Sequence, residues 1–555
     1  MSARYPLLVT LYAPTLEGTH MKQAVEHFLA RAVLALRVNS EAFWLAPAGY
    51  LTALKWWLLR KRVRARGQFA VLLGRTSRAY EWRSLMDGAD GRFPSRPGLP
   101  PIIALVQEVG APSQADVTMA SLAADNLAAY LISADSAQAL KDIAATIDWS
   151  ASPWFMPIAA GDLIALGAAQ AYRDVIAGSP FRAIYADDDH ITTDGHRTKP
   201  HYKPDWNADL HLHHDYVTGA CIIKTDRAAF EQAANAQDWA AALVQGAVLA
   251  GAGAGHIRQV LHHRRNRPAP CLLLPALNVP RDLPRVSVII PTRNRLDLLS
   301  TCIAGLASAD YPDLEVIVVD NDSDDPATLD FLEKLQERGM RVLRHAGPFN
   351  YSAINNRAVG EATGALVCLL NNDVEMLSPD WLKIMTTQAL RDEVGAVGAQ
   401  LLYPDGRIQH AGVVIGVGNA AGHAHRFLRP GDLGYFRRHA LPQFVAAVTA
   451  ACLVVRRDRF LAVGGLDETR FRVAYNDVDL CLRLNERGWQ SFYEPRAVLV
   501  HHESVSRGFD RDPVGAARFA EELAALQERW QTNRIVDPFH HPLLSRASEQ
   551  FVIGL

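Results

Sequence analysis

The chain has 555 residues, which is too long for a single hydrophobic core and predicts about two to four domains. Hydrophobic residues make up 49% of it and charged residues 21%, as in an ordinary soluble globular protein. The formal net charge of −2 argues against a dedicated nucleic-acid-binding protein, which usually carries a basic surface, so no nucleic-acid partner is predicted.

The cysteines and the start of the chain indicate a cytoplasmic protein. No C-x-x-C spacing occurs, and several cysteines lie inside apolar runs, which is typical of buried thiols in a reducing compartment. No window of 18 apolar residues is present, and Met1 to Pro14 lacks the pattern of a signal peptide. The cysteines are Cys221, Cys271, Cys302, Cys368, Cys452 and Cys481.

Residues 1–95 are predicted to form a mainly helical region. Within it, the segment from Leu51 to Arg66 combines Trp56 and Trp57 with six basic residues. A basic, Trp-bearing helix can lie at the inner face of a membrane beside anionic lipids. The alternative is a helix whose aromatic side chains pack inside while its basic residues face water. Helices of this second kind are the commoner ones. A Gly-, Pro- and Asp-rich stretch, from Asp87 to Pro101, predicts a linker.

Residues 100–275 alternate apolar runs with helical patterns, which predicts a parallel α/β sheet. One run ends in A-G-D at Asp162, and another, from Ala183 to His190, ends in three carboxylates and a histidine. Asp187, Asp188, Asp189 and His190 could bind a metal through hard oxygen ligands, or could equally be a solvated strand end. A second linker is predicted from His262 to Pro270.

A clearer unit follows, in which three predicted strands end in polar or acidic residues. The strands lie in R-V-S-V-I-I-P-T-R-N-R, L-E-V-I-V-V-D-N-D-S-D-D and A-L-V-C-L-L-N-N-D-V-E. This predicts a doubly wound, nucleotide-binding sheet. Neither G-x-G-x-x-G after the first strand nor G-x-x-x-x-G-K-[ST] occurs, which argues against a dinucleotide dehydrogenase or a P-loop enzyme. Asp373, near Asn371 and Glu375, suits a Mg²⁺ or Mn²⁺ ion that bridges a diphosphate.

Two further segments carry candidate catalytic residues. Asp477 and Asp479 open a predicted helix that ends at Gly488, and one of these acids is expected to cap the helix while the other serves as a general base. His501 and His502 end a predicted strand and are candidate metal ligands.

Six motifs, in this order, resemble family 2 glycosyltransferases with the GT-A fold. They are V-S-V-I-I-P-T-R-N-R, V-V-D-N-D-S, L-L-N-N-D-V-E, V-T-A-A-C-L-V-V-R, N-D-V-D-L-C-L-R and H-H-E-S-V-S-R-G. The resemblance implies an α/β fold with a catalytic domain over residues 283–535. It also implies transfer of a sugar, with inversion, from a nucleotide-diphosphate donor to an acceptor hydroxyl, usually with a divalent cation. A glycan or lipid-linked acceptor in surface polysaccharide synthesis is implied as well.

The resemblance also assigns roles to single residues. Asp373 and His501 would bind the metal, with His502 a weaker candidate than His501, and Asp477 would deprotonate the acceptor while Asp479 shapes the acceptor site. The implied donor-binding residues are Thr292, Asp320, Asn321, Asn356 and Asn371.

Residues 100–275 resemble the same family more weakly. The A-G-D ending at Asp162 looks like a worn metal motif, and the nucleoside-binding motif is missing, since the corresponding strand ends at S-A-D-S, residues 133–136. This half is therefore predicted to be a degenerate or acceptor-handling GT-A-like domain, and a second active site with another donor is the competing interpretation. A non-catalytic scaffold that binds nucleotide or glycan is the rival for the whole chain. Residues 536–555 are predicted to be a C-terminal tail.

Overall fold

The computed structural model describes residues 18–87, 100–133, 136–502 and 513–555. It divides the chain into two compact units, residues 1–90 together with Leu555, and residues 91–554. The predicted linker from Asp87 to Pro101 lies almost wholly outside the described residues, as does the segment from Met1 to Pro14.

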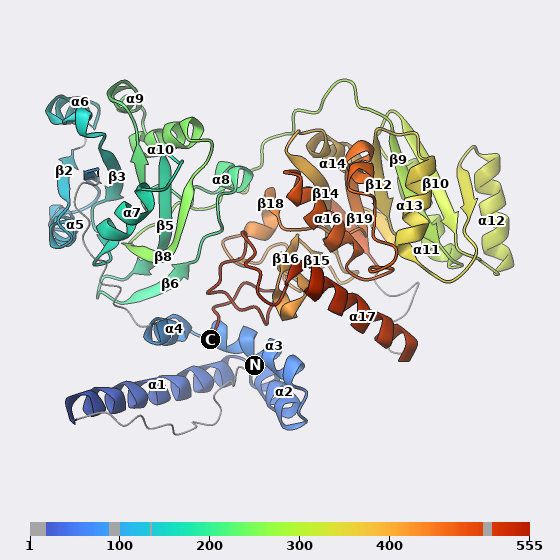
Figure 1. Ribbon diagram of the computed structural model, residues 1–555, viewed down its shortest axis with the longest axis horizontal. Coiled ribbons are helices and arrows are strands. Elements are labelled where there is room, and N and C mark those ends of the chain that lie inside the picture. The colour runs from blue at the N-terminus through green and yellow to red at the C-terminus, as the bar shows by residue number, and fades with distance from the viewer. Residues whose placement is uncertain (1–17, 88–99, 134–135, 503–512) are drawn as a thin grey trace. The chain divides into compact units, whose positions relative to one another are not determined.

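The described part of unit 1 is helical, as the sequence predicts (Figure 1). Leu34, Val38, Phe69 and Leu73, with Trp82, form a small core in which each helix buries one face. No helix among the described residues of the chain is long and apolar enough to cross a membrane. The helices are α1 (Gly18–Leu45), α2 (Pro47–Leu58), α3 (Arg62–Gly74) and α4 (Ala79–Asp87).

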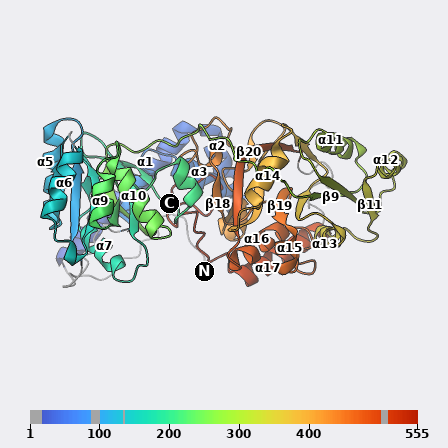
Figure 2. The ribbon, with the colours of Figure 1, turned by 90° about the horizontal axis from the view of Figure 1, so that it is seen from above.

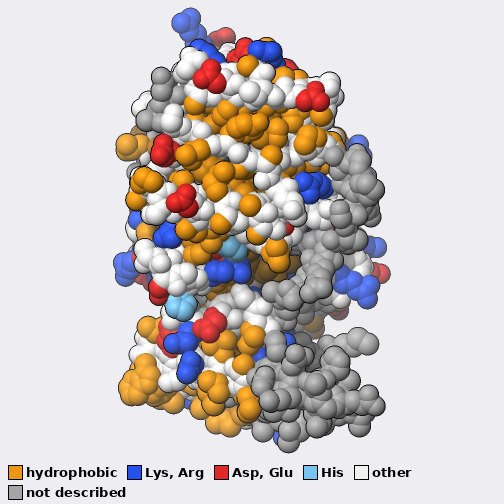
Figure 3. All heavy atoms as spheres, turned by 90° about the vertical axis from the view of Figure 1, so that its left-hand side faces the viewer, with side chains coloured by type: hydrophobic (Ala, Val, Ile, Leu, Met, Phe, Trp, Pro, Cys, Tyr) orange, Lys and Arg blue, Asp and Glu red, His pale blue; other side chains and the backbone are white. Residues whose placement is uncertain are grey.

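Unit 2 contains two large sheets, and the first of them has the strand order β2-β1-β3-β7-β5-β8-β4, with β6 paired to β5. Its strands are β1 (Ile102–Gln107), β2 (Ala128–Ile132), β3 (Trp154–Ala159), β4 (Leu163–Ile164), β5 (Ala183–Ile191), β6 (Arg197–His201), β7 (Cys221–Lys224) and β8 (Gly255–Arg264). Strand β2 is the outer edge, and Figure 3 views the molecule from this side, where apolar side chains lie between scattered charged ones.

Helices cover both faces of the first sheet, and a separate apolar layer fills each side. Leu140 from α6 and Leu243 from α10 belong to one layer, while Leu122 from α5 and Tyr172 from α7 belong to the other. The helices are α5 (Pro112–Ala124), α6 (Ser136–Thr146), α7 (Ala168–Ile176), α8 (Ala208–His213), α9 (Arg227–Ala233) and α10 (Trp239–Ala250).

The second sheet has the strand order β11-β10-β9-β12-β19-β14-β20-β13, with β15 paired to β14 and β18 to β20. Every residue of β9 and β12 is buried, as expected for central strands with helices on both faces. The strands are β9 (Val286–Thr292), β10 (Leu314–Asp320), β11 (Arg341–Arg344), β12 (Leu366–Leu370), β13 (Val374–Met376), β14 (Val394–Leu402), β15 (Ile408–His410), β18 (Gln443–Val445), β19 (Cys452–Arg456) and β20 (Gln490–His501); β16 (Val413–Ile415) and β17 (Ala421–His423) pair separately.

Helices also lie on both faces of the second sheet. Seen from above, α11 and α14 lie on one side, and α13, α15 and α16 lie on the other (Figure 2). Leu299 and Leu382 fill the first layer, and Ile354 and Leu480 fill the second. The helices are α11 (Leu296–Ala307), α12 (Pro326–Glu337), α13 (Tyr351–Glu361), α14 (Trp381–Ala389), α15 (Arg457–Ala462), α16 (Asn476–Glu486) and α17 (Pro513–Trp530).

The two sheets share one design. The order β2-β1-β3-β7-β5-β8-β4 matches β10-β9-β12-β19-β14-β20-β13 strand for strand, and β11 is an addition at the edge of the second sheet. Directions match as well, because β7 and β19 both run antiparallel to their two neighbours. The predicted fold class, a mixed α/β chain with a doubly wound sheet, a related preceding sheet and a helical start, is confirmed.

Two details differ from the sequence predictions. The predicted linker from His262 to Pro270 begins inside β8, where His262 and His263 are buried and paired with β4. The pattern G-H-I-R-Q-V-L-H-H-R hides this strand because its polar residues find buried partners from distant elements. Cys271 is exposed, whereas the other five cysteines are buried, and all six are free thiols.

Residues 531–554 pack against both sheets. The Asp537 carboxylate accepts a hydrogen bond from the backbone N–H of Ile415 (2.7 Å), the last residue of β16. His541 Nε2 lies 2.9 Å from Asp187 Oδ2 on β5, and its ring stacks on Tyr202. The predicted C-terminal tail, residues 536–555, is thus a partly buried segment that contacts both halves of unit 2.

Candidate active site at the carboxyl edge of the second sheet

The carboxyl ends of β9, β10 and β12 bring several of the predicted donor-binding residues to one edge of the sheet. Thr292 ends β9, Asp320 ends β10 and Asn371 directly follows β12. The amide of Asn372 donates a hydrogen bond to Thr292 Oγ1 (3.0 Å), which ties the loop after β12 to the end of β9. Open α/β sheets bind their ligands at this edge.

Asp320 and Asn321 carry buried oxygen atoms that no donor reaches within the described chain. Asp320 Oδ1 accepts a hydrogen bond from the backbone N–H of Ser323 (3.0 Å), whereas Oδ2 has no hydrogen-bond partner and lies 3.6 Å from Arg344 Nε. Asn321 donates to two backbone carbonyls, and its Oδ1 has no partner. Buried acceptors without donors are costly, so this pair is suited to a ligand that supplies hydroxyl or N–H groups.

Asp373 and His501 face each other across the same edge. Val374 on β13 pairs with His501 on β20, and this register places His501 Nε2 3.1 Å from Asp373 Oδ1. Two neighbouring ligands of one Mg²⁺ or Mn²⁺ ion, each about 2.1 Å from it, also lie about 3 Å apart. No group of three or more His, Cys, Asp and Glu side chains suited to a metal occurs among the described residues. Asp373 and His501 could therefore supply two ligands to such an ion.

Gln409 fixes the orientation of His501, and the sequence analysis missed it. Gln409 Oε1 lies 2.7 Å from His501 Nδ1 and can only accept a hydrogen bond, so Nδ1 carries a proton and Nε2 faces Asp373. A ring nitrogen lone pair and a carboxylate oxygen at 3.1 Å repel each other unless a proton or a cation lies with them. His502 instead lies 3.1 Å from Glu375, which makes it the weaker candidate ligand.

Two further histidines lie beside Gln409, the buried His410 and the half-buried His423. The backbone carbonyl of Gln409 accepts a hydrogen bond from His423 Nδ1 (2.9 Å), and His410 Nε2 accepts one from the backbone N–H of Thr449 (3.3 Å). Burial lowers the pKa of His410 to about 3, so this ring is neutral. The signal for these residues is the polar Q-H pair at 409–410 within a short buried strand, β15.

Asp477 and Asp479 have different environments at the start of α16. Asp477 is half-buried, and its Oδ2 accepts a hydrogen bond from the backbone N–H of Ala450 (3.1 Å), just before β19. Asp479 is fully buried and binds Arg483 Nε (2.8 Å) and Trp530 Nε1 (2.9 Å), which fastens α17 to α16. Asp477 is thus the more accessible of the two acids, whereas the carboxylate of Asp479, the predicted acceptor-side residue, is paired with Arg483 and Trp530.

Asn356 and Asn371 complete the predicted donor-binding set, and the structure separates their roles. Both amide atoms of Asn356 bind the backbone of Leu466, at 2.8 Å in each case, so its side chain holds the turn after α15. Asn371 Nδ2 lies 3.4 Å from His501 Nε2, which places Asn371 beside the metal candidates.

The first sheet has a counterpart of Asp373 with different neighbours. Asp162 follows β3 as Asp373 follows β12, and the next residue, Leu163, pairs with His263 as Val374 pairs with His501. Asp162 accepts a hydrogen bond from the backbone N–H of Arg265 (2.7 Å) and lies 3.6 Å from Arg264 Nε. Burial raises the pKa of Asp162 to about 6 despite this guanidinium.

The acids of β5 are neither a solvated strand end nor a metal site, and both earlier interpretations are corrected. Asp188 is buried and lies 2.7 Å from Lys203 Nζ and 2.5 Å from Arg267 Nε. Burial alone would raise the pKa of Asp188, but these cations hold it well below its usual range. Asp187 is paired with His256 and His541, and Asp189 with His263 and Arg197. Arg197 and Lys203 lie on or next to the neighbouring strand β6, whereas His256, His263, Arg267 and His541 come from distant parts of the chain, which no local pattern reveals.

Comparison with known proteins identifies the second sheet. Residues 287–460 match the family model for glycosyl transferase family 2. An uncharacterized protein, y4gI, of Sinorhizobium fredii is 40% identical over 420 residues, 67% of this chain and 46% of that protein. The O-antigen biosynthesis protein RfbC of Myxococcus xanthus is 35% identical over 409 residues, 65% of this chain and 31% of that protein. This chain therefore spans less than half the length of these two relatives.

Among solved structures, a mannosyltransferase of Pyrobaculum calidifontis in complex with GDP-Man and Mn²⁺ is 20% identical. It covers 49% of this chain and 72% of its own, with a TM-score of 0.35, a level at which the likeness carries no weight for this site. The family model spans the ends of β9, β10 and β12 that carry Thr292, Asp320 and Asp373. Residues 287–460 of the second sheet therefore match glycosyl transferase family 2, the family that the sequence motifs resemble.

Proposed function

We propose that the second sheet is the catalytic domain of an inverting, metal-dependent glycosyltransferase. It moves a sugar from a nucleotide-diphosphate donor to a hydroxyl of a glycan or lipid-linked acceptor in surface polysaccharide synthesis. The observation that carries the proposal is the Asp373–His501 pair, 3.1 Å apart, beside the orphaned buried oxygens of Asp320 and Asn321. The name of the O-antigen biosynthesis relative supports the choice of pathway.

The donor's two ends would meet different residues. Asp320 and Asn321 would accept hydrogen bonds from the nucleoside, with Thr292 and Asn371 nearby, while Asn356 would act indirectly through the turn at Leu466. Asp373 and His501 would hold Mg²⁺ or Mn²⁺, with Gln409 fixing the ring of His501. When bound, such an ion neutralises the charge that develops on the departing diphosphate.

The transfer would be a single displacement. The acceptor oxygen forms a bond to the anomeric carbon as the bond from that carbon to the diphosphate oxygen breaks, and the nucleoside diphosphate leaves with the electron pair. Asp477 takes the proton of the attacking hydroxyl, because a sugar hydroxyl becomes acidic only as the new bond forms. The hydrogen bond that Asp477 accepts from the N–H of Ala450 would hold the carboxylate in place while the side chain stays partly accessible.

The first sheet is not proposed to be a second catalytic domain. Arg264, Lys203 and Arg267 already supply positive charge to Asp162 and Asp188, so a divalent cation there would add charge to a balanced cluster. A role in handling the acceptor fits the ordered contacts between the halves, such as Asn207 Nδ2 to the carbonyl of Phe444 (2.8 Å).

The test is a product-release assay with a matched pair of variants. The full chain, with Mn²⁺ or Mg²⁺, is incubated with a panel of nucleotide sugars, and free nucleoside diphosphate is measured for the wild type, Asp373→Asn and Asp162→Asn. Both substitutions keep the size of the side chain and occupy corresponding positions in the two sheets.

We expect release from one donor, abolished by Asp373→Asn and by a chelator and retained by Asp162→Asn. Equal loss in the two variants, or full release by Asp373→Asn, would overturn the assignment of the active site. Nucleotide binding without release from any donor, in the presence of extracts that contain acceptors, would favour the non-catalytic scaffold.

A further inference from the structure

Unit 1 contains a long segment with many basic residues and no acidic ones. From Ala42 to Tyr80 the sequence holds no Asp or Glu, but it contains the basic residues Lys55, Arg60, Lys61, Arg62, Arg64, Arg66, Arg75 and Arg78. The chain as a whole has a formal net charge of −2, so this positive segment is a local feature. Such a concentration attracts a negatively charged partner over roughly a Debye length.

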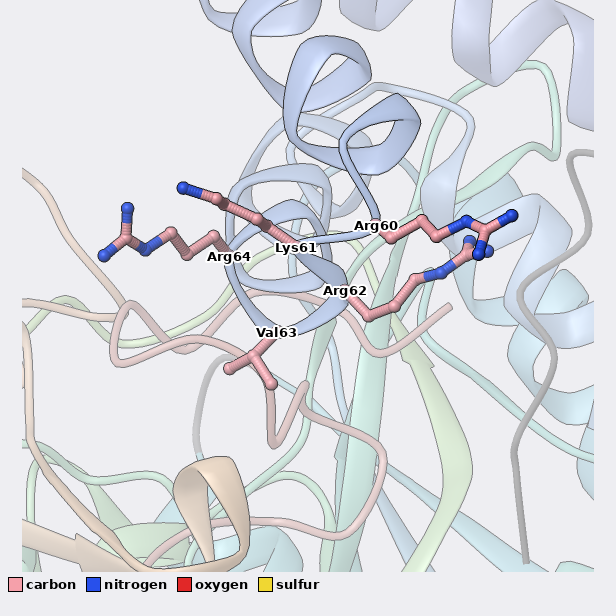
Figure 4. Close-up of a pocket in the computed structure, with 5 residues that line it drawn as sticks. All are labelled: Arg60, Lys61, Arg62, Val63 and Arg64. Atoms are coloured by element: carbon pink, nitrogen blue, oxygen red, sulfur yellow. The ribbon is translucent and has the colours of Figure 1, made fainter. Parts of the chain in front are cut away.

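The basic residues gather at the turn between α2 and α3. Arg60 has a φ of 57°, the left-handed conformation that sharply turns the chain, and Arg60 to Arg64 are all exposed. Figure 4 shows Arg60 and Arg62 extending to one side of this corner, Lys61 and Arg64 to the other, and Val63 between them. These five residues line an open hollow of about 460 Å³.

These charges are not neutralised within the described chain. No carboxylate among the described residues lies within ion-pair distance of Arg60, Lys61, Arg62 or Arg64. Three of these side chains instead make cation–π contacts with Trp56 and Trp57. Lys61 Nζ and Arg64 Cζ lie 5.0 and 5.3 Å from the ring of Trp56, and Arg62 Cζ lies 5.3 Å from that of Trp57.

Apolar side chains project from the same corner. Leu58, Leu59 and Val63 are 65%, 55% and 81% exposed, whereas Trp56 and Trp57 are half-buried against the core of unit 1. The sequence interpretation in which the aromatic residues pack inside is therefore correct for the tryptophans, but leucines and a valine remain among the basic residues. Aliphatic groups beside unpaired cations are the composition of a membrane-interface surface.

We propose that the α2–α3 corner docks on a bilayer of anionic phospholipids, with Leu58, Leu59 and Val63 entering the interface. The hollow lined by Arg60 to Arg64 would bind phosphate groups of the lipid heads. Nucleic acid fits less well, because single strands stack their bases on open aromatic faces, and cations cover these tryptophan faces. Aliphatic side chains gain from an apolar phase and contribute little beside a phosphate backbone. The inference rests on unit 1 alone and is independent of the proposed function.

The experiment is vesicle flotation of the full chain. Phosphatidylcholine vesicles with and without phosphatidylglycerol are compared over a series of salt concentrations, with duplex and single-stranded DNA tested in parallel. One variant changes Arg60, Lys61, Arg62 and Arg64 to Ser, and a second changes Leu58, Leu59 and Val63 to Ser. The matched control changes four exposed arginines of unit 2, Arg338, Arg429, Arg470 and Arg487, to Ser and removes the same charge.

We expect anionic vesicles to bind the wild type at least about tenfold more tightly than neutral ones, with weakening as salt rises. The affinity of the basic-residue variant for anionic vesicles should fall at least about tenfold, whereas that of the control should not change measurably. The affinity of the apolar variant should fall about tenfold even at low salt. Circular dichroism should show unchanged helix content in each variant.

Equal binding to neutral and anionic vesicles would overturn the proposal, as would equal loss in the control. Tight binding to DNA without binding to vesicles would overturn it in favour of a nucleic-acid surface.

Discussion

The two sheets of unit 2 have the same strand order, but the acids that follow corresponding strands have different partners. In each, an acid follows a central parallel strand and the next residue pairs with a histidine, Asp162 with His263 and Asp373 with His501. In the second sheet the histidine faces the acid at 3.1 Å. In the first sheet the acid is beside Arg264, and His263 turns to Asp189, with 2.8 Å between Nδ1 and Oδ1.

The two sheets differ in the source of the positive charge beside their acids. Arg264 and Lys203 are side chains of the protein itself, so the first sheet is balanced as soon as it folds, and a cation from solution has no carboxylate left to neutralise. In the second sheet, the position that corresponds to Arg264 holds His502, and His501 faces Asp373. Under the proposed function, Asp373 and His501 would hold an exchangeable metal together with the donor diphosphate.

The two sheets also differ in the helix before the long strand, α10 before β8 and α16 before β20. Both α10 and α16 follow a short helix and precede β8 and β20, and α16 carries Asp477 in its first turn. The first turn of α10 contains no acid, and Asp238 before it caps the helix by accepting the N–H of Ala241 (2.9 Å). The first sheet therefore has no counterpart of the proposed base.

The largest expected effect tests the difference between α16 and α10 by removing the proposed base, Asp477. Asp477→Asn should lower turnover by roughly 10²–10⁴-fold, the usual contribution of a general base, with donor affinity largely unchanged. Steady-state release of nucleoside diphosphate and donor titration by calorimetry measure the two quantities. Asp238→Asn, the control on α10, should keep full activity. An equal loss of donor affinity in Asp477→Asn would make Asp477 structural.

Removing a charge from the first sheet should affect stability rather than catalysis. Asp188→Asn leaves the fully buried Lys203 without its partner, so the free energy of unfolding should fall by about 3–5 kcal/mol in urea titrations. Asp330→Asn, in an exposed pair with Lys334, should cost less than about 1 kcal/mol. The double variant Asp188→Leu with Lys203→Met should recover only the part of the loss that the unpaired Lys203 causes, because Arg267 also pairs with Asp188. Recovery by added Mn²⁺ instead would reveal a metal site in the first sheet.

The smallest expected effect concerns the residue that orients His501. Gln409→Ala removes the acceptor for Nδ1, and the affinity for Mn²⁺ should fall by about 10- to 100-fold in titrations followed by electron paramagnetic resonance. Gln409→Glu keeps the acceptor and should retain most of the affinity. If Gln409→Ala binds Mn²⁺ as the wild type does, His501 is not a metal ligand held by Gln409.

Local patterns were enough to find most of the second sheet. Strands such as Val286–Thr292 and Leu366–Leu370 are continuous apolar runs that end in polar residues, and burial on both faces demands that pattern. A repeat between the halves is also visible, since A-C-I-I-K-T-D-R-A-A-F at 220–230 and A-C-L-V-V-R-R-D-R-F at 451–460 occupy equivalent strands and helices. Strand β8 was hidden because its polar residues are satisfied only by remote partners.

The sequence by itself determined the alternation of strands and helices, the family of the second sheet and the acids at its strand ends, because burial and strand termini constrain neighbouring residues. Tertiary structure alone decided which acids are accessible. It buried Asp479 against Arg483 and Trp530 and left Asp477 half-exposed, although both lie in one turn of helix. It also placed Gln409 against His501, 92 residues away, and Lys203 against Asp188. Charge pairing acts through space, so residue order alone could not predict which acids would be neutralised.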